Sequence, residues 1–119
     1  NKLGVAPSNA KVLIIGVAYK KDLGDWRESP AINVINRLLE DGVDIAYHDP
    51  FVPEIVIGSR RFYSIPLNNE VLASPELIII ATDHREIDYI NLVNNARAVL
   101  DTRGVTRKLN CAKEKVTLL

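Results

Sequence analysis

Apolar runs and amphipathic segments alternate along this chain. Residues 11–15, 77–81 and 98–100 are continuous apolar stretches, as expected of strands that are buried on both faces of a sheet. Residues 30–41 place apolar side chains on one face at helical spacing, and Gly42 supplies a C-terminal stop for that helix. The pattern therefore predicts three core strands and one long amphipathic helix.

The segments between these elements carry weaker signals. Residues 43–47 are predicted to form a strand that ends at the turn signal of residues 48–50. An edge-like strand is predicted near residues 61–64, and short helices are predicted at residues 67–73 and 87–95. The chain thus continues the alternation of strand and helix to its last core strand.

Strands that alternate with helices predict an α/β domain, here a three-layer Rossmann-like open parallel sheet with helices on both faces. The simplest topology places the first strand at the centre, with its neighbours wound outward in both directions. A cleft would then open between the loop that follows residue 15 and the loop that follows residue 81. The basic tail after Arg103 is expected to be a surface segment.

The loop at residues 16–28 is the most informative segment. It joins the carboxyl end of a predicted strand to the amino end of a predicted helix, whose first turn is signalled by Ser29 and Pro30. Open α/β sheets bind ligands at such loops, and helix amides attract anions there. The loop therefore predicts a site for a phosphate-bearing small molecule. Three cations lie in or beside it: Lys20, Lys21 and Arg27.

Arg27 has two interpretations. A cation at the amino end of a helix opposes the helix dipole by roughly 0.3–1 kcal/mol at an exposed site. Its position is favourable if an anion occupies the helix end and the planar guanidinium chelates that anion. Alternatively, Arg27 pairs with Asp22 or Asp25 and shapes the loop. The residues alone leave both interpretations open.

Other polar residues at predicted strand ends are also ambiguous. Asp83 and His84 follow a core strand and could serve acid–base chemistry, whereas Asp83 could equally cap the loop. Asp49 could bind a ribose, but an aspartate before proline favours a turn. Tyr19 could stack on a base or seal the cleft, although an aromatic residue at a strand end is more often part of the core.

Several known motifs are missing. The run after Gly16 is not the Gly-rich fingerprint of a dinucleotide-binding turn, and the sequence has no P-loop, nucleophile elbow or zinc pattern. The two histidines lack the spacing of metal ligands. Taken alone, the chain is predicted to be a binding module.

Composition narrows the class of protein. The chain has 119 residues, enough for one domain, with 47% hydrophobic and 25% charged residues. Fifteen basic and fifteen acidic side chains cancel, which argues against broad binding of nucleic acid or an anionic membrane. A single cysteine, Cys111, excludes an internal disulfide and is compatible with the cytosol. Because the chain has no methionine, we expect it to be a piece of a longer protein.

Four motifs in order resemble a known family. They are Gly-x-Ala-Tyr-Lys followed by Asp-x-Arg-Glu-Ser-Pro-Ala within residues 16–31, then residues 47–53, 81–84 and 100–103. Together they resemble the C-terminal, UDP-sugar-binding domain of the UDP-glucose/GDP-mannose dehydrogenase family. The resemblance covers residues 11–103. It implies that residues 1–10 are a linker from upstream domains and that residues 11–119 are the UDP-sugar-binding domain.

The resemblance also implies an activity for the complete protein. Family members oxidise a sugar C6 alcohol to a carboxylate in two NAD-dependent steps, through a thioester on a cysteine of an upstream motif. NAD binds an N-terminal Rossmann domain, and a helical linker carries the interface of a cytoplasmic homodimer. Neither the cysteine motif nor the NAD fingerprint occurs in this sequence, so Cys111 does not inherit the catalytic role. We therefore expect the chain to be inactive alone and to bind UDP-sugar weakly, since it holds only part of the pocket.

Site residues can be carried over only where the motifs match. Tyr19 and Lys20 correspond to the aromatic–lysine pair of the substrate cleft, and Arg27 to the arginine of the Arg-Glu-Ser motif. Asp83 and His84 match the loop beside that cleft. The predicted substrate-binding set is Tyr19, Lys20, Arg27, Ser29, Asp83, His84 and Arg103.

Two other functions were weighed against this one. The chain could be a stand-alone regulatory module that binds nucleotides without chemistry, or a mainly structural domain that contributes oligomer contacts. Within the leading hypothesis, UDP-glucose, UDP-N-acetylmannosamine and UDP-N-acetylglucosamine all remain candidate substrates, because sugar contacts would come largely from the other domains.

Overall fold

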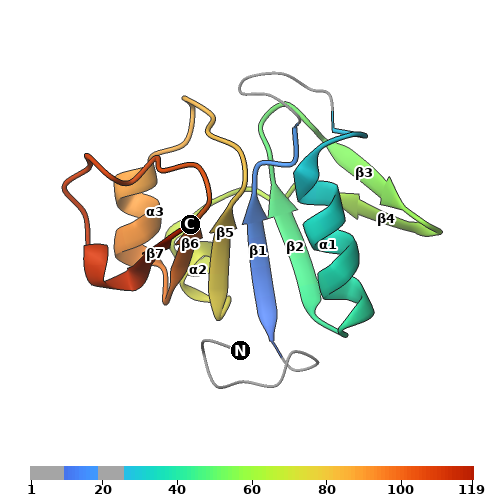
Figure 1. The fold of residues 1–119 in the computed structure, drawn as a ribbon, viewed down its shortest axis with the longest axis horizontal. Coiled ribbons are helices and arrows are strands. Elements are labelled where there is room, and N and C mark those ends of the chain that lie inside the picture. The colour runs from blue at the N-terminus through green and yellow to red at the C-terminus, as the bar shows by residue number, and fades with distance from the viewer. Residues whose placement is uncertain (1–9, 19–25) are drawn as a thin grey trace.

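A five-stranded parallel sheet forms the centre of the molecule in the computed structural model, which describes residues 10–18 and 26–119 (Figure 1). Its strands are β1 (Lys11–Ile15), β2 (Asp44–His48), β5 (Leu77–Ile80), β6 (Val99–Asp101) and β7 (Val116–Leu118). Their order across the sheet is β2-β1-β5-β6-β7, and every neighbouring pair is parallel. The chain winds outward in both directions from the β1–β5 pair, as predicted, but the prediction that the first strand is the central one is wrong: β5 is the middle strand, because β7 extends the sheet beyond β6.

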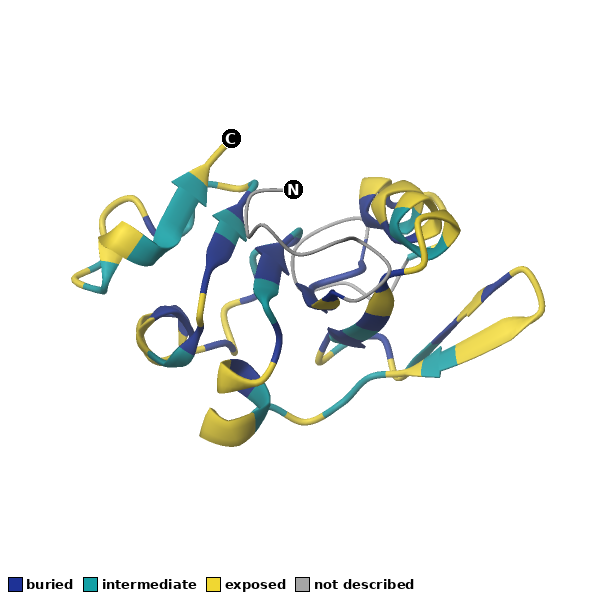
Figure 2. Cartoon of the chain, turned by 90° about the horizontal axis from the view of Figure 1, so that it is seen from below, coloured by how far each residue is buried: buried dark blue, intermediate teal, exposed yellow. Residues whose placement is uncertain are grey.

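Helices cover both faces of this sheet. They are α1 (Pro30–Glu40), α2 (Asn69–Ala73) and α3 (Tyr89–Asn95). Alternate residues of β1 serve the two faces: Val12 and Ile14 pack in the cluster that includes Ile35 of α1, whereas Leu13 and Ile15 pack in the cluster beneath α2 and α3. Figure 2 shows the helices on opposite sides of the buried strands. The predicted three-layer α/β fold is therefore confirmed.

Helix α1 begins and ends as its sequence predicts. The Ser29 hydroxyl accepts a hydrogen bond from the amide of Ala31 at 3.2 Å, and Pro30 occupies the first helical position. Gly42 follows the helix with a φ of +80°, the left-handed conformation that a helix stop commonly uses. None of the helices in the described part of the chain is long and apolar enough to cross a membrane.

One predicted strand belongs to a different sheet. The edge-like strand expected near residues 61–64 is β4 (Arg60–Tyr63), which pairs antiparallel with β3 (Glu54–Ile57) in a hairpin beside β2 (Figure 1). Strand β3 was not predicted from the sequence. Its short alternation of buried and exposed residues is interrupted after four positions by the left-handed Gly58, so it gave no continuous apolar run.

The tail lies largely at the surface, as predicted, but it also contributes an edge strand to the sheet, which was not predicted. After a 3-10 turn at Lys113–Lys115, the chain forms β7, which pairs with β6 and completes the sheet. Val105, Leu109 and Val116 pack against the cluster beneath α2 and α3. Lysines lie between these apolar positions, which gave the tail a polar composition despite its packing.

Candidate functional site

The carboxyl ends of the parallel strands meet at one edge of the sheet. From β1 the chain crosses to β2 on one side, whereas from β5 it crosses to β6 on the other. The reversal of direction therefore lies between β1 and β5, which is where open α/β sheets bind ligands. The loops that begin at Gly16 and at Ala81 are the ones that the sequence analysis expected to border the cleft.

These two loops touch at their bases. Gly16 has a φ of +84°, and a Cβ atom there would lie 2.5 Å from Cβ of Thr82 and 2.9 Å from its backbone nitrogen and oxygen. The Thr82 hydroxyl donates a hydrogen bond to the carbonyl of Ala18 at 2.9 Å. Glycine at position 16 is thus needed for both the backbone conformation and the close approach of the loops.

A buried carboxylate holds the loop after β1. Oδ2 of Asp49 accepts hydrogen bonds from the amides of Val17 at 2.8 Å and Ala18 at 3.0 Å, and lies 2.9 Å from Nε2 of His84. Oδ1 accepts from the amide of Phe51 at 2.8 Å. Asp49 is only 2% exposed, so it binds the protein's own loops, as the turn interpretation favoured, rather than standing open to a ribose.

His84 lies behind this carboxylate. The residue has no exposed surface, and its ring packs 5.2 Å from that of Phe51. Its backbone amide donates to the hydroxyl of Tyr89 at 2.9 Å. His84 therefore joins the loops after β2 and β5, while the neighbouring Asp83 is half-buried at the end of β5. A direct contact of either residue with substrate stays a prediction.

The carboxylates that end β2 and β6 are both stabilised in their ionised form. Burial alone would raise the pKa of Asp49, but hydrogen bonds from His84 and from backbone amides hold it below its ordinary value. Burial also works against ionisation of Asp101, and hydrogen bonds from Thr106 and neighbouring amides again lower the pKa. Both side chains are therefore anionic at neutral pH.

Acid is expected to destabilise the protein through these two groups. Because folding lowers each pKa, their stabilisation is fully present above the ordinary carboxyl pKa of about 3.9 and is lost as pH falls through the lower folded values. Urea unfolding from about pH 6 to about pH 3 should show this loss. Asp49→Asn should make the free energy of unfolding depend less steeply on pH. An unchanged pH dependence would mean that Asp49 does not contribute to the loss of stability in acid.

The amino end of α1 carries two residues of the predicted site. Ser29 is 3% exposed, and its hydroxyl both caps the helix and donates to the carbonyl of Ala18 at 3.3 Å. Arg27 is exposed, and its side chain has no ion pair with any residue in ranges 10–18 and 26–119. Tyr19 and Lys20 lie outside the described residues, as do the two aspartates considered as partners of Arg27.

Arg103 lies on the loop after β6 and is exposed. That loop is folded around the buried Asp101, whose carboxylate accepts hydrogen bonds from Arg103, Gly104, Val105 and Thr106. Asp101 was not among the functional residues predicted from the sequence. An aspartate directly after a core strand, followed closely by glycine and threonine, is the pattern that could have found it.

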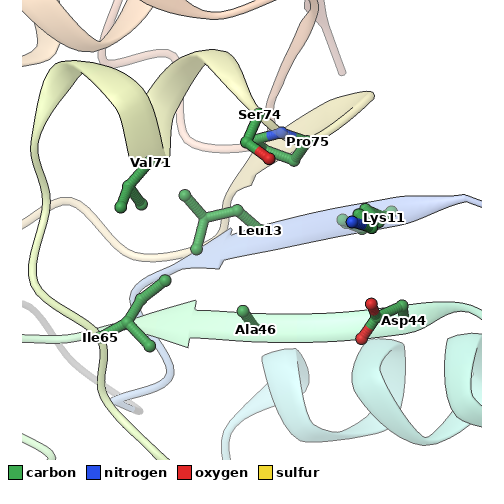
Figure 3. Close-up of a pocket in the computed structure, with 9 residues that line it drawn as sticks. Lys11, Leu13, Asp44, Ala46, Ile65, Val71, Ser74 and Pro75 are labelled. Atoms are coloured by element: carbon green, nitrogen blue, oxygen red, sulfur yellow. The ribbon is translucent and has the colours of Figure 1, made fainter.

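A separate groove lies along the sheet on the face of α2 (Figure 3). Its cavity volume is about 200 Å³, and Leu13, Ala46, Ile65 and Val71 make its floor apolar. It runs beside β1 and β2 from their amino ends and contains neither Arg27 nor Arg103. Among residues 10–18 and 26–119, no three histidine, cysteine, aspartate or glutamate side chains cluster as metal ligands would.

Comparison with known proteins decides the family. Residues 13–108 match the UDP-binding domain of the UDP-glucose/GDP-mannose dehydrogenase family. The chain belongs to this family.

Relatives of this UDP-binding domain are much longer proteins. A UDP-N-acetyl-D-mannosamine dehydrogenase of Methanococcus maripaludis is 31% identical in an alignment of 114 residues that covers 87% of this chain and 24% of the relative. UDP-glucose 6-dehydrogenase 4 of Arabidopsis thaliana is 55% identical over 47 residues, 40% of this chain and 10% of the relative. The chain thus spans about a quarter of the length of the first of these relatives.

Solved structures share this fold. A UDP-D-ManNAc dehydrogenase from Pyrococcus horikoshii shares the fold with a TM-score of 0.73 at 24% identity, over 98% of this chain and 27% of that one. A UDP-glucose dehydrogenase from Pyrobaculum islandicum gives a TM-score of 0.69 at 26% identity, over 92% and 24%. In this UDP-binding domain, the described members of the predicted site lie at the amino end of α1 and in the loops that follow the adjacent strands β5 and β6.

Proposed function

We propose that this chain is the UDP-sugar-binding part of an NAD-dependent UDP-sugar 6-dehydrogenase. The diphosphate would lie at the carboxyl edge of the sheet, beside the loops after β1, β5 and β6. The observation that carries the proposal is the exposed Arg27 at the amino end of α1. The segment between β1 and α1 is held at Ala18 by buried hydrogen bonds to Asp49 and Ser29, beside the point between β1 and β5 where the winding of the sheet reverses. An anion there would be favoured both by the guanidinium and by the helix amides.

The remaining functions of the enzyme are assigned to other parts of the complete protein. NAD would bind an upstream Rossmann domain, and an upstream cysteine would form the thioester. Cys111 is not assigned the thioester role, because it lies outside any motif of that kind; its side chain packs half-buried against the cluster beneath α2 and α3. We further propose that the complete enzyme is a cytoplasmic homodimer, with this domain contributing substrate contacts rather than catalytic groups.

Titration of the chain with UDP, UDP-glucose and NAD, followed by amide NMR shifts, tests the proposal. Shifts for the two UDP compounds concentrated at Tyr19, Lys20, Arg27 and Ser29, with none for NAD, would support it. Saturable binding of NAD to the same loop would instead indicate a cofactor domain and would overturn the assignment.

Reversal of charge at Arg27 should weaken UDP binding strongly. Arg27→Glu removes charge-assisted hydrogen bonds, each worth about 1.5–3 kcal/mol, so we expect the Kd for UDP to rise by about tenfold to a hundredfold. The fold should be unaffected, because Arg27 is exposed and forms no ion pair with residues 10–18 or 26–119.

Arg37→Glu is the matched control for this change. Arg37 lies in α1 near the end of the helix that is farther from Arg27, and its side chain is 76% exposed beside Asp41. Its reversal should leave the Kd for UDP unchanged. Equal weakening in both variants would indicate a general charge effect, and no weakening in Arg27→Glu would remove Arg27 from the site.

A further inference from the structure

The loop after β6 is organised by one side chain. Oδ1 of Asp101 accepts hydrogen bonds from the amides of Arg103 at 3.0 Å, Gly104 at 2.8 Å and Val105 at 3.3 Å. Oδ2 accepts from the amide of Thr106 at 2.9 Å and from its hydroxyl at 2.7 Å. Five donors from four successive residues thus converge on a single carboxylate.

This carboxylate is isolated from solvent, so the loop cannot exchange it readily for water. Asp101 has no exposed surface and Thr106 is only 1% exposed. Gly104 takes a φ of +73°, which allows the chain to turn around the carboxylate. The loop is therefore held by hydrogen bonds within the protein itself, and hydrogen bonds to a charged acceptor are stronger than those to a neutral one.

The residue that this arrangement presents is Arg103. Its amide is tied to Asp101, whereas its side chain is exposed and has no ion pair with any residue in the described ranges. Strand β6 adjoins β5, so the loop stands at the same edge of the sheet as Thr82 and Asp83. A long, flexible cation binds a diphosphate better when its backbone is already fixed, because less conformational entropy is lost on binding.

We infer that Asp101 is a positioning residue for UDP-sugar binding, and that it acts by holding the backbone of Arg103 so that the guanidinium meets the diphosphate. The inference rests on the proposed function. Asp101 itself touches no ligand, because its carboxylate is buried and fully engaged by the loop.

Asp101→Asn is the variant that tests this role with the least change in volume. Its amide oxygen can still accept from the amides of Arg103 and Gly104, while its NH2 group replaces the acceptor used by the amide of Thr106. Amide hydrogen exchange at Arg103, Gly104 and Val105 should become faster by about tenfold or more. Unchanged exchange would overturn the positioning role independently of any ligand.

A double-mutant cycle with Arg103→Gln then tests whether Asp101 acts through Arg103. We expect each single variant to raise the Kd for UDP by about tenfold, and Asp101→Asn to add little once Arg103 is replaced. The same weakening in both backgrounds would mean a general loss of structure and would overturn the inference. Full UDP affinity in Arg103→Gln would also overturn it while leaving the proposed function intact, whereas saturable binding of NAD in place of UDP by the wild type would refute both.

Two further variants keep the test decisive. Asp44→Asn removes an equal charge at the amino end of β2, on the opposite edge of the sheet, and should change neither exchange nor affinity. Thr106→Val deletes only the hydroxyl donor to Asp101 and keeps the shape of the buried side chain. If Asp101→Asn fails to fold, Thr106→Val should still speed exchange at Arg103 and weaken UDP binding by a few-fold; the absence of both effects would overturn the inference.

Discussion

Replacing Asp49 by alanine is expected to lower the free energy of unfolding by about 3–5 kcal/mol, because several buried hydrogen-bond donors lose their acceptor at once. The substitution removes the acceptor of the amides of Val17 and Ala18 and the partner of Nε2 of His84. These donors would be left buried, and each unsatisfied group costs about 1–3 kcal/mol. Urea unfolding at neutral pH, followed by circular dichroism, measures the loss.

Asp88→Ala is the matched control for that experiment. Asp88 also accepts an amide hydrogen bond, from Asn91 at 3.0 Å, but it does so at the exposed amino end of α3. Loss of a helix cap costs about 0.5–2 kcal/mol. If Asp49→Ala were no more destabilising than this control, the buried carboxylate would not be what holds the three loops together.

Local patterns predicted the main elements of the fold well. Helix α1 was found within one residue, because spacing, capping and the glycine stop all agree there. Strands β1, β5 and β6 were identified because each is a continuous apolar run, as expected of strands buried on both faces of a sheet. Strands β3 and β7 were missed because each is short and partly exposed, so that its pairing depends on contacts with distant segments more than on its own composition.

The position of the site in the fold was predictable from the sequence, but the hydrogen bonds that hold its loops together were not. Topology alone put the loops after β1 and β5 together. The turn interpretation of Asp49 accounts for its hydrogen bond to Phe51, two residues away. Its bonds to Val17, Ala18 and His84 span more than thirty positions, as the pairing of three strands dictates, and no local pattern encodes them.

The same hydrogen bonds explain how this domain keeps exposed arginines close to buried carboxylates without forming ion pairs between them. The buried anions Asp49 and Asp101 are satisfied by backbone amides, a histidine and a hydroxyl, not by arginine or lysine. Arg27 and Arg103 are therefore left without ion pairs among the described residues. Buried acidic side chains thus hold the loops and leave these two arginines exposed, where they could meet the diphosphate of the proposed UDP-sugar ligand.

Gly16→Ala is expected to destabilise the protein by about 2–5 kcal/mol. The left-handed backbone costs about 1–2 kcal/mol for a residue with a Cβ atom, and overpacking typically adds about 1–3 kcal/mol. At this position the new Cβ atom would lie 2.5 Å from Cβ of Thr82 and 2.9 Å from its backbone nitrogen and oxygen, and these backbone atoms cannot rotate away. Separation of the two loops should also broaden or shift the amide resonances of Val17 and Ala18.

Gly58→Ala separates the two causes. Gly58 has a φ of +61°, but a Cβ there would have no atom within 4 Å, so only the backbone cost of about 1–2 kcal/mol applies. The difference between the two variants in urea unfolding therefore measures the close approach of the loops after β1 and β5. Equal destabilisation would mean that these loops can part at little cost, and that their contact does not hold the base of the proposed UDP site.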